Sequence, residues 1–213
     1  MSISVDLRVL ELVCSRICHD LVSPVGAVNN GVELIREMAD DDAPSSGLES
    51  EALALIAHSA EQGSRRLRVL RLAYGAAGAD APWEELRSAL SQFFIGSRIN
   101  LSWPDQAPTL PKSGGGLGKL VVNTVLLAAD SLGQNGTISL EPRPDGIAVI
   151  ATGTAPTLDA ERSAALAGRT APADLDPRSI HAYVTARFAT HYGVKLSAVN
   201  AATERLEFTI TVP

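Results

Sequence analysis

The side chains of this chain that are best suited to catalysis lie in one short stretch, Cys18-His19-Asp20-Leu21-Val22-Ser23-Pro24. His19 lies two positions past Ile17, an apolar member of a helical pattern, which is about 200° around the helix. Its ring is therefore expected to face solvent, and an exposed neutral imidazole is a nucleophile. Asp20 could orient this ring or accept its proton, and Ser23 lies on the same face, so both are grouped with His19 as catalytic candidates.

Pro24 interrupts an otherwise continuous helical pattern. A proline inside a helix removes a backbone donor and clashes with the preceding turn, at a cost of about 3 kcal/mol. We therefore expect a kink one turn after His19 that frees the carbonyl of Asp20.

The face around His19 carries small and polar residues that let another protein approach the ring. The candidate partner-binding residues on this helix are Leu12, Ser15, Arg16, Gly26 and Asn30.

Two long helices must position this stretch. Apolar or small residues recur every three or four positions from Ile3 to Ala39 and from Leu53 to Tyr74, with the polar run 40–46 between them. This pattern predicts an antiparallel hairpin. Each helix also carries a second apolar strip that one partner helix cannot cover, which predicts a homodimer built on a four-helix bundle. The strip comprises Val5, Val9, Leu12, Val13, Leu48, Leu55, Val69 and Leu72.

The hairpin register predicts a basic cluster beside His19. If the turn is centred near Ala43, facing positions sum to about 87. This places four arginines level with the histidine: Arg65, Arg66, Arg68 and Arg71. Such a cluster suits a phosphoryl group or an acidic partner, and Arg65 and Arg68 are assigned to partner binding. The alternative is that the arginines complement the negative C-terminal end of their own helix.

The remainder of the chain predicts an α/β sandwich with one helical layer. Pro and Gly become frequent from Gly75 onward, which places a boundary near 75–81 and divides the chain into 1–76 and 80–213. Helices are expected at 83–95, 117–132 and 179–192, and a loop between 152 and 178. Strands are expected at 98–103, 137–140, 147–151, 195–199 and 206–212.

Composition excludes several classes of function. Of 213 residues, 46% are apolar, which is enough for a folded core, and 18 Lys and Arg against 24 Asp and Glu give a net charge of −6. This balance argues against nonspecific binding to nucleic acid or to an anionic membrane. No apolar run approaches the ~20 residues of a membrane span, and no signal segment is visible, so a cytoplasmic protein is expected.

The cysteines and the remaining histidines are expected to be structural. Cys14 and Cys18 are interpreted as small core residues without a disulfide. Together with His19 they lack a fourth ligand at matching spacing, so a metal site is not expected. The other three histidines are expected to be ordinary surface or packing residues: His58, His181 and His191.

Residues 17–28 resemble the H-box of bacterial sensor histidine kinases, in which a phospho-accepting His precedes an acidic residue and a Pro follows at +5. The downstream half resembles the ATP-binding module of these kinases, a GHKL (Bergerat) fold. Residues 120–130 are similar to its N-box helix, 149–154 to its G1 box, and 180–212 to its closing helix and strands.

The departures from this resemblance concern nucleotide binding. Leu127 stands where the kinases have a second N-box Asn for the Mg²⁺-nucleotide complex, and Ala151 stands where an Asp contacts adenine. Residues 168–170 are a poor substitute for the glycine-rich lid, and 114–119 do not fit the phosphate-loop pattern. An intact histidine with an altered nucleotide site resembles the dimeric histidine phosphotransferases of the ChpT type.

This resemblance implies a homodimer that relays phosphoryl groups. The group would pass from the receiver Asp of a CckA-like hybrid kinase through His19 to the Asp of CtrA-like response regulators. The chain would need no cofactor, since the receiver supplies Mg²⁺, and would not be an ATP-dependent autokinase. One alternative is a non-catalytic scaffold or inhibitor of two-component signalling, against which the retained His19, Asp20 and Pro24 argue. Another is an autokinase with an unusual nucleotide site, supported only by Asn123.

Overall fold

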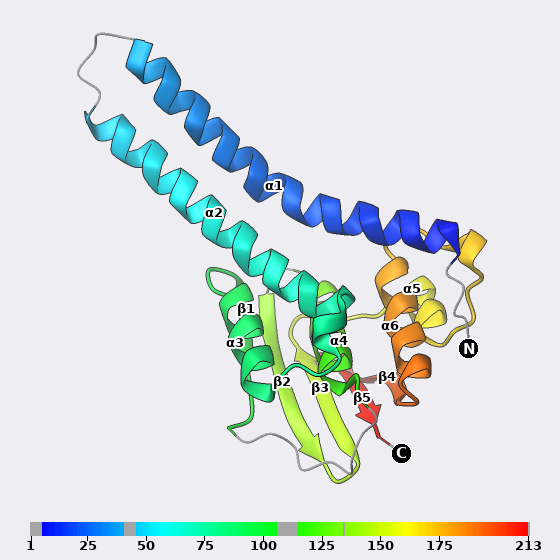
Figure 1. Ribbon diagram of the computed structural model, residues 1–213. Helices are drawn as coiled ribbons and strands as arrows, with labels where there is room; N and C mark the ends of the chain where they lie inside the picture. The colour runs from blue at the N-terminus through cyan, green and yellow to red at the C-terminus, as the bar shows by residue number, and fades with distance from the viewer. Residues whose placement is uncertain (1–5, 41–45, 106–114, 134, 213) are drawn as a thin grey trace.

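The computed structural model describes residues 6–40, 46–105, 115–133 and 135–212. Two long helices, α1 (Leu7–Asp40) and α2 (Ser46–Tyr74), form an antiparallel hairpin that extends away from an α/β unit (Figure 1). The predicted hairpin is therefore confirmed. A Cβ atom added to Gly63 would lie 3.6 Å from the Cβ of Pro24, and one added to Gly31 would lie 2.6 Å from Cγ1 of Ile56. Both pairs sum to 87, which is the predicted register.

Helix α1 is continuous through Pro24 but bends in its middle part (Figure 1). The proline cannot donate to the carbonyl of Asp20 four residues earlier. That carbonyl instead accepts a hydrogen bond of 3.4 Å from Nη1 of Arg66 on α2. The expected kink is present. As expected, the carbonyl of Asp20 is released from its helical hydrogen bond, and it accepts one from α2 instead.

The α/β unit is a five-stranded sheet with helices packed against it. Its strands are β1 (Arg98–Ser102), β2 (Asn135–Arg143), β3 (Gly146–Thr152), β4 (Lys195–Ala202) and β5 (Arg205–Thr211). Their order is β1-β2-β3-β5-β4, with β1 parallel to β2 and the other pairs antiparallel. The larger helices are α3 (Trp83–Phe93), α4 (Leu117–Leu132) and α6 (Ile180–His191). Each of these elements was expected from the sequence.

Short elements lie in the connections. Single 3-10 turns occur at Ala76–Gly78 and Pro172–Asp174. Helix α5 (Ala160–Leu166) lies within the segment predicted to be a loop, so that part of the prediction is wrong. The carboxylate of Asp159 caps this helix by accepting from the backbone N–H of Arg162 at 2.8 Å.

The hairpin and the α/β unit share one hydrophobic core. Val9 and Leu12 of α1 and Val69 and Leu72 of α2 are buried in the same cluster as the core residues of α4 and the sheet. The prediction that these four residues await a second copy is therefore wrong, because the chain's own α/β unit covers them. Leu48 and Leu55 of the predicted strip do remain exposed, together with seven other apolar residues of the hairpin: Leu7, Leu10, Val22, Val25, Leu34, Leu53 and Leu67.

Candidate functional site

His19 lies on α1, five residues before Pro24, and its side chain is 89% exposed, as predicted. Its Nδ1 is 3.4 Å from Oδ1 of Asp20. Because a carboxylate only accepts hydrogen bonds, this contact favours the tautomer that carries the proton on Nδ1. Nε2, the ring nitrogen farther from Asp20, then keeps its lone pair.

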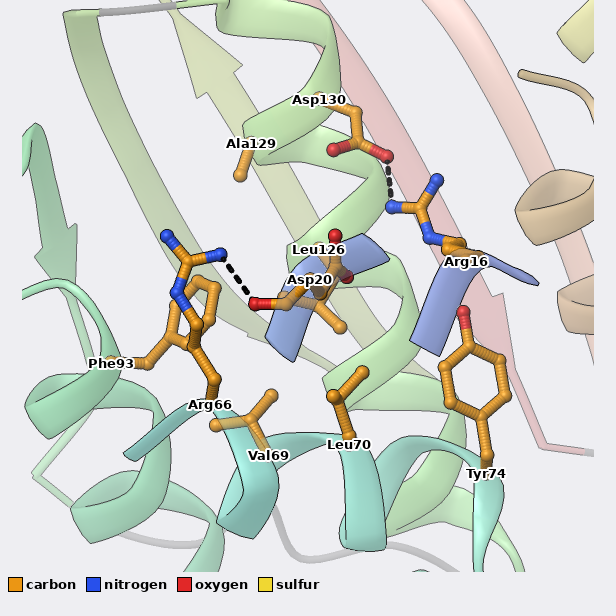
Figure 2. Close-up of a pocket in the computed structure, with 10 residues that line it drawn as sticks. All are labelled: Arg16, Asp20, Arg66, Val69, Leu70, Tyr74, Phe93, Leu126, Ala129 and Asp130. Carbon is orange, nitrogen blue, oxygen red and sulfur yellow. Dashed lines mark hydrogen bonds and ion pairs between the residues drawn. The ribbon is translucent and has the colours of Figure 1, made fainter. Parts of the chain in front are cut away.

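Asp20 contacts the His19 ring on one side and lines an interior cavity on the other. Its side chain is 31% exposed, and its carbonyl is held by Arg66. Behind it lies a cavity of about 140 Å³ between α1, α2 and α4 (Figure 2). The cavity is lined by Arg16, Asp20, Arg66, Val69, Leu70, Tyr74, Phe93, Leu126, Ala129 and Asp130. The segment that carries His19 therefore rests on both the second helix and the α/β unit.

Three of the predicted partner-binding residues lie on the open surface around His19 or further along α1. Ser15, Gly26 and Asn30 are exposed, as is the catalytic candidate Ser23. A Cβ atom added to Gly26 would meet nothing within 4 Å, so this surface is open to an approaching protein. Small and polar residues thus border the ring, as the sequence predicted.

Leu12 and Arg16 depart from their predicted role. Leu12 is only 5% exposed because it packs into the shared core, so it does not contribute to an exposed docking surface. The guanidinium of Arg16 is turned inward and lies 2.8 Å from Oδ2 of Asp130 on α4 (Figure 2). Cys14 and Cys18, predicted to be core residues, are instead exposed, free thiols. In this part of α1, the face that packs therefore lies one or two positions before the predicted apolar seam.

The four arginines predicted to lie beside His19 have separate partners. Arg66 contacts the backbone of Asp20, whereas Arg65 pairs with Glu61 on its own helix. The other two face α3. Arg68 donates to Ser88 and Gln92 at 3.4 Å each, and Arg71 pairs with Glu85 at 3.1 Å. The structure thus brings Arg66 to the histidine segment and engages Arg65 and Arg68, the two assigned to partner binding, within the chain.

Asp130 is a functional candidate that sequence reasoning missed. Its Oδ2 contacts both Arg16 and Nδ1 of His181, the latter at 3.4 Å. Burial by itself would raise the pKa of Asp130, but the hydrogen bond with His181 and the charge of Arg16 outweigh it and lower that pKa to about 2. His181, expected to be a surface or packing residue, is buried, and its Nε2 lies 3.1 Å from Oδ1 of Asn123.

The positions that resemble nucleotide ligands are otherwise engaged. Asn123 is fully buried, and its amide nitrogen donates to the carbonyls of Ala73 and Lys119 at 2.8 Å each. Leu127 and Ala151 are fully buried apolar residues. Asn123, the one support for an autokinase, therefore uses both amide protons to hold protein backbone.

Within the described ranges, neither a metal-binding cluster nor a membrane-spanning helix is found. Among these residues, His, Cys, Asp and Glu side chains form no cluster of three or more that could hold a metal ion. Within the same ranges, no helix has the length and apolar character required to cross a membrane.

The ion pair of Asp130 predicts an acid-dependent loss of stability. Because the folded pKa of about 2 lies below the ordinary value of 3.8, the carboxylate stabilises the fold above about pH 4, and this contribution is lost as the pH falls toward 2. Asp130→Asn is therefore expected to lower the melting temperature at pH 7, and the gap from wild type should narrow below pH 4. Thermal unfolding from pH 7 to pH 2 measures it. A gap that stays constant over this range would contradict the prediction.

Three comparisons relate this chain to known proteins. The family model described as the histidine phosphotransferase C-terminal domain matches residues 83–204, more than half of the chain. Protein phosphotransferase ChpT of Brucella abortus (strain 2308) is 29% identical over 221 residues, covering 98% of this chain and 99% of that protein. A solved structure of a bacterial phosphotransferase is 28% identical with a TM-score of 0.76, covering 99% of this chain and 98% of that one. The predicted fold class is confirmed, and the chain belongs to the histidine phosphotransferases of the ChpT type.

Proposed function

We propose that this protein is a phosphorelay intermediate in which Nε2 of His19 accepts a phosphoryl group from the Asp of one receiver domain and passes it to the Asp of another. The observation that carries the proposal is the 89% exposed imidazole with its Nδ1 beside the carboxylate of Asp20. A nucleophile with a fixed tautomer on a rigid helix, bordered by small residues, suits transfer between two proteins.

The transfer step balances without a cofactor bound to this chain. The lone pair of Nε2 attacks the phosphorus of the receiver's acyl phosphate, so an N–P bond forms while the bond from phosphorus to the carboxyl oxygen breaks. The receiver is left with a free carboxylate, and its own Mg²⁺ neutralises the transferring oxygens. The ring gains positive charge during attack, and the adjacent Asp20 carboxylate stabilises that charge. The same steps in reverse load the second receiver.

We propose that the working form is a homodimer. The exposed apolar residues of the hairpin include Leu10 and Val25 on α1 and Leu53 and Leu67 on α2, each between 52% and 64% exposed. Four large apolar side chains on one two-helix hairpin are covered when two hairpins pack as a four-helix bundle. Each copy would then present its own His19 at the edge of that bundle.

Mg-ATP is expected to leave the melting temperature unchanged. The polar groups that would contact a nucleotide are absent at Leu127 and Ala151 and engaged at Asn123. A ligand present at 100 times its dissociation constant stabilises a protein by about 2.7 kcal/mol, which a thermal scan detects easily. The scan compares the protein with and without millimolar Mg-ATP, using an ATP-binding histidine kinase as the positive control. A clear upward shift would restore the autokinase alternative.

The experiment that tests the function follows label between two proteins. A receiver domain is phosphorylated on its Asp by its own kinase, separated from that kinase and from ATP, and mixed with this protein. Acid-labile label should appear on this protein within minutes and move on when a second, unlabelled receiver is added. Mg-ATP alone should not label it. If several receivers fail to transfer, the scaffold alternative becomes the better account.

A further inference from the structure

Three polar residues lie along one face of α4 and contact the hairpin. Lys119, Asn123 and Asp130 are spaced by four and seven residues, which places them on the same side of a helix. Lys119 Nζ donates to the carbonyl of Gly75 at 2.6 Å, and Asn123 donates to the carbonyl of Ala73. These carbonyls lie at the C-terminal end of α2, where a helix leaves acceptors without intrahelical partners. This polar face of α4 therefore holds the end of α2.

Asp130, at the other end of this face, holds α1. Its Oδ2 accepts from Nη2 of Arg16 at 2.8 Å, and Figure 2 shows the two side chains meeting at the edge of the cavity behind Asp20. His181 contacts the same oxygen and is itself positioned by Asn123. The side chains of Asp130 and Arg16 are 38% and 20% exposed, while that of His181 is fully buried. The carboxylate is thus oriented from inside and bound to α1 from outside.

The part of α1 that carries His19 depends on these contacts. We refer to residues 7–20 as the α1 arm. Val9 and Leu12 of the arm are buried against the α/β unit, and Arg8 donates to the carbonyl of Leu175 at 3.4 Å. Beyond the arm, Pro24 and Gly31 pack against α2. His19 lies at the junction of these two parts, close to the bend, so the direction of the arm sets the direction of its ring.

We infer that Asp130 is a positioning residue for phosphoryl transfer. It holds the α1 arm through Arg16 and so fixes the orientation of the His19 ring toward a docked receiver. Asp130 has no part in the transfer chemistry, since its contacts are with Arg16 and His181. The inference rests on the proposed function. It also assigns a role to the altered kinase-like domain, because its helix α4, which resembles the N-box helix, contacts both helices of the hairpin.

Two phosphoryl donors separate the orientation of the His19 ring from its intrinsic reactivity. Asp130→Asn keeps the shape of the side chain and removes its charge. From a saturating phosphorylated receiver, we expect the maximal transfer rate constant to fall about 10-fold to 100-fold, because reacting groups displaced by about 1 Å lose that much. From phosphoramidate, a small donor that needs no docking, labelling of His19 should be unchanged. Arg16→Gln should behave alike, and the double variant should be no slower than either single one.

A matched control removes an ion pair elsewhere in the α/β unit. Glu207→Gln breaks the contacts of a β5 carboxylate with Arg143 and Arg205, at 3.4 and 3.0 Å, on the sheet away from the hairpin. It should leave both transfer rates at the wild-type value. If Asp130→Asn transfers from the receiver at the wild-type rate, or slows both donors equally, the inference is overturned.

Hydrogen exchange gives a second readout that needs no receiver. Amides of the α1 arm should exchange faster in Asp130→Asn, while those of α1 beyond Gly31 should not change. Equal protection of the arm in both proteins would overturn the inference. If wild type takes no label from any receiver, the proposed function fails, while hydrogen exchange still decides whether Asp130 holds the arm. Should Asp130→Asn not fold, Arg16→Gln removes the same ion pair from α1.

Discussion

His19→Gln is expected to abolish the acceptance of a phosphoryl group from a phosphorylated receiver domain. Glutamine has a similar polarity but no ring nitrogen with a free lone pair, so no N–P bond can form. The side chain is 89% exposed, and substitutions at such positions change stability by only about 0.5 kcal/mol, so the variant should fold as wild type does. The measurement is the label on each protein over time, together with a melting curve for each.

The matched control is His58→Gln. His58 is an exposed histidine on α2 of the same hairpin, with Nε2 2.9 Å from the amide nitrogen of Gln62. It should take up label at the wild-type rate. If His19→Gln accepts label as wild type does, another residue is the phosphoryl acceptor. If neither wild type nor His19→Gln is labelled, but both bind receivers equally well, the scaffold alternative gains support.

The local geometry around His19 could be predicted because it depends on one short stretch of sequence. The exposure of His19 follows from its angular offset along one helix, and the bend follows from the missing donor of Pro24. The hairpin register follows from the turn position, and the packing of Gly63 on Pro24 confirms it. These features depend only on local sequence or on a single helix pairing.

The errors along α1 share one physical cause, which is that α1 packs against two different surfaces. The predicted apolar seam runs through Leu10 and Cys14, whereas the buried face runs one or two positions earlier along the arm, through Val9 and Leu12. A shift of one residue is about 100° around a helix, enough to exchange buried and exposed sides. Periodicity marks apolar positions, but it does not tell which of two apolar strips the α/β unit covers.

The contact network of Asp130 could not be found in the same way. Arg16 and His181 are separated from Asp130 by 114 and 51 residues, and no periodic pattern joins them. Helix α5 was missed for a different reason, since seven residues show too few turns for a period. Its N-cap, Asp159, was a usable signal, because Asp before a short helical run is a common helix start.

Leu72→Ala is expected to destabilise the whole chain by about 2 to 5 kcal/mol, the range for removing a fully buried leucine from a packed core. Leu72 lies on α2, is 0% exposed, and belongs to the cluster that joins the hairpin to the α/β unit. A cavity at this position weakens contacts on both sides of the junction. Urea unfolding measures the loss at one protein concentration, since self-association would otherwise change the apparent stability.

Two optical signals test whether the junction makes the chain one cooperative unit. The far-ultraviolet signal reports mainly the long helices of the hairpin, while fluorescence reports Trp83 and Trp103, whose rings lie 4.5 Å apart in the α/β unit. Both transitions should shift together in Leu72→Ala, because its side chain belongs to a core that both parts share. The control Ile95→Ala removes a side chain that is 58% exposed and should change stability by no more than about 0.5 kcal/mol. If only the fluorescence transition moved, the hairpin would be stable without this core, and the α1 arm could not depend on the α/β unit for its direction.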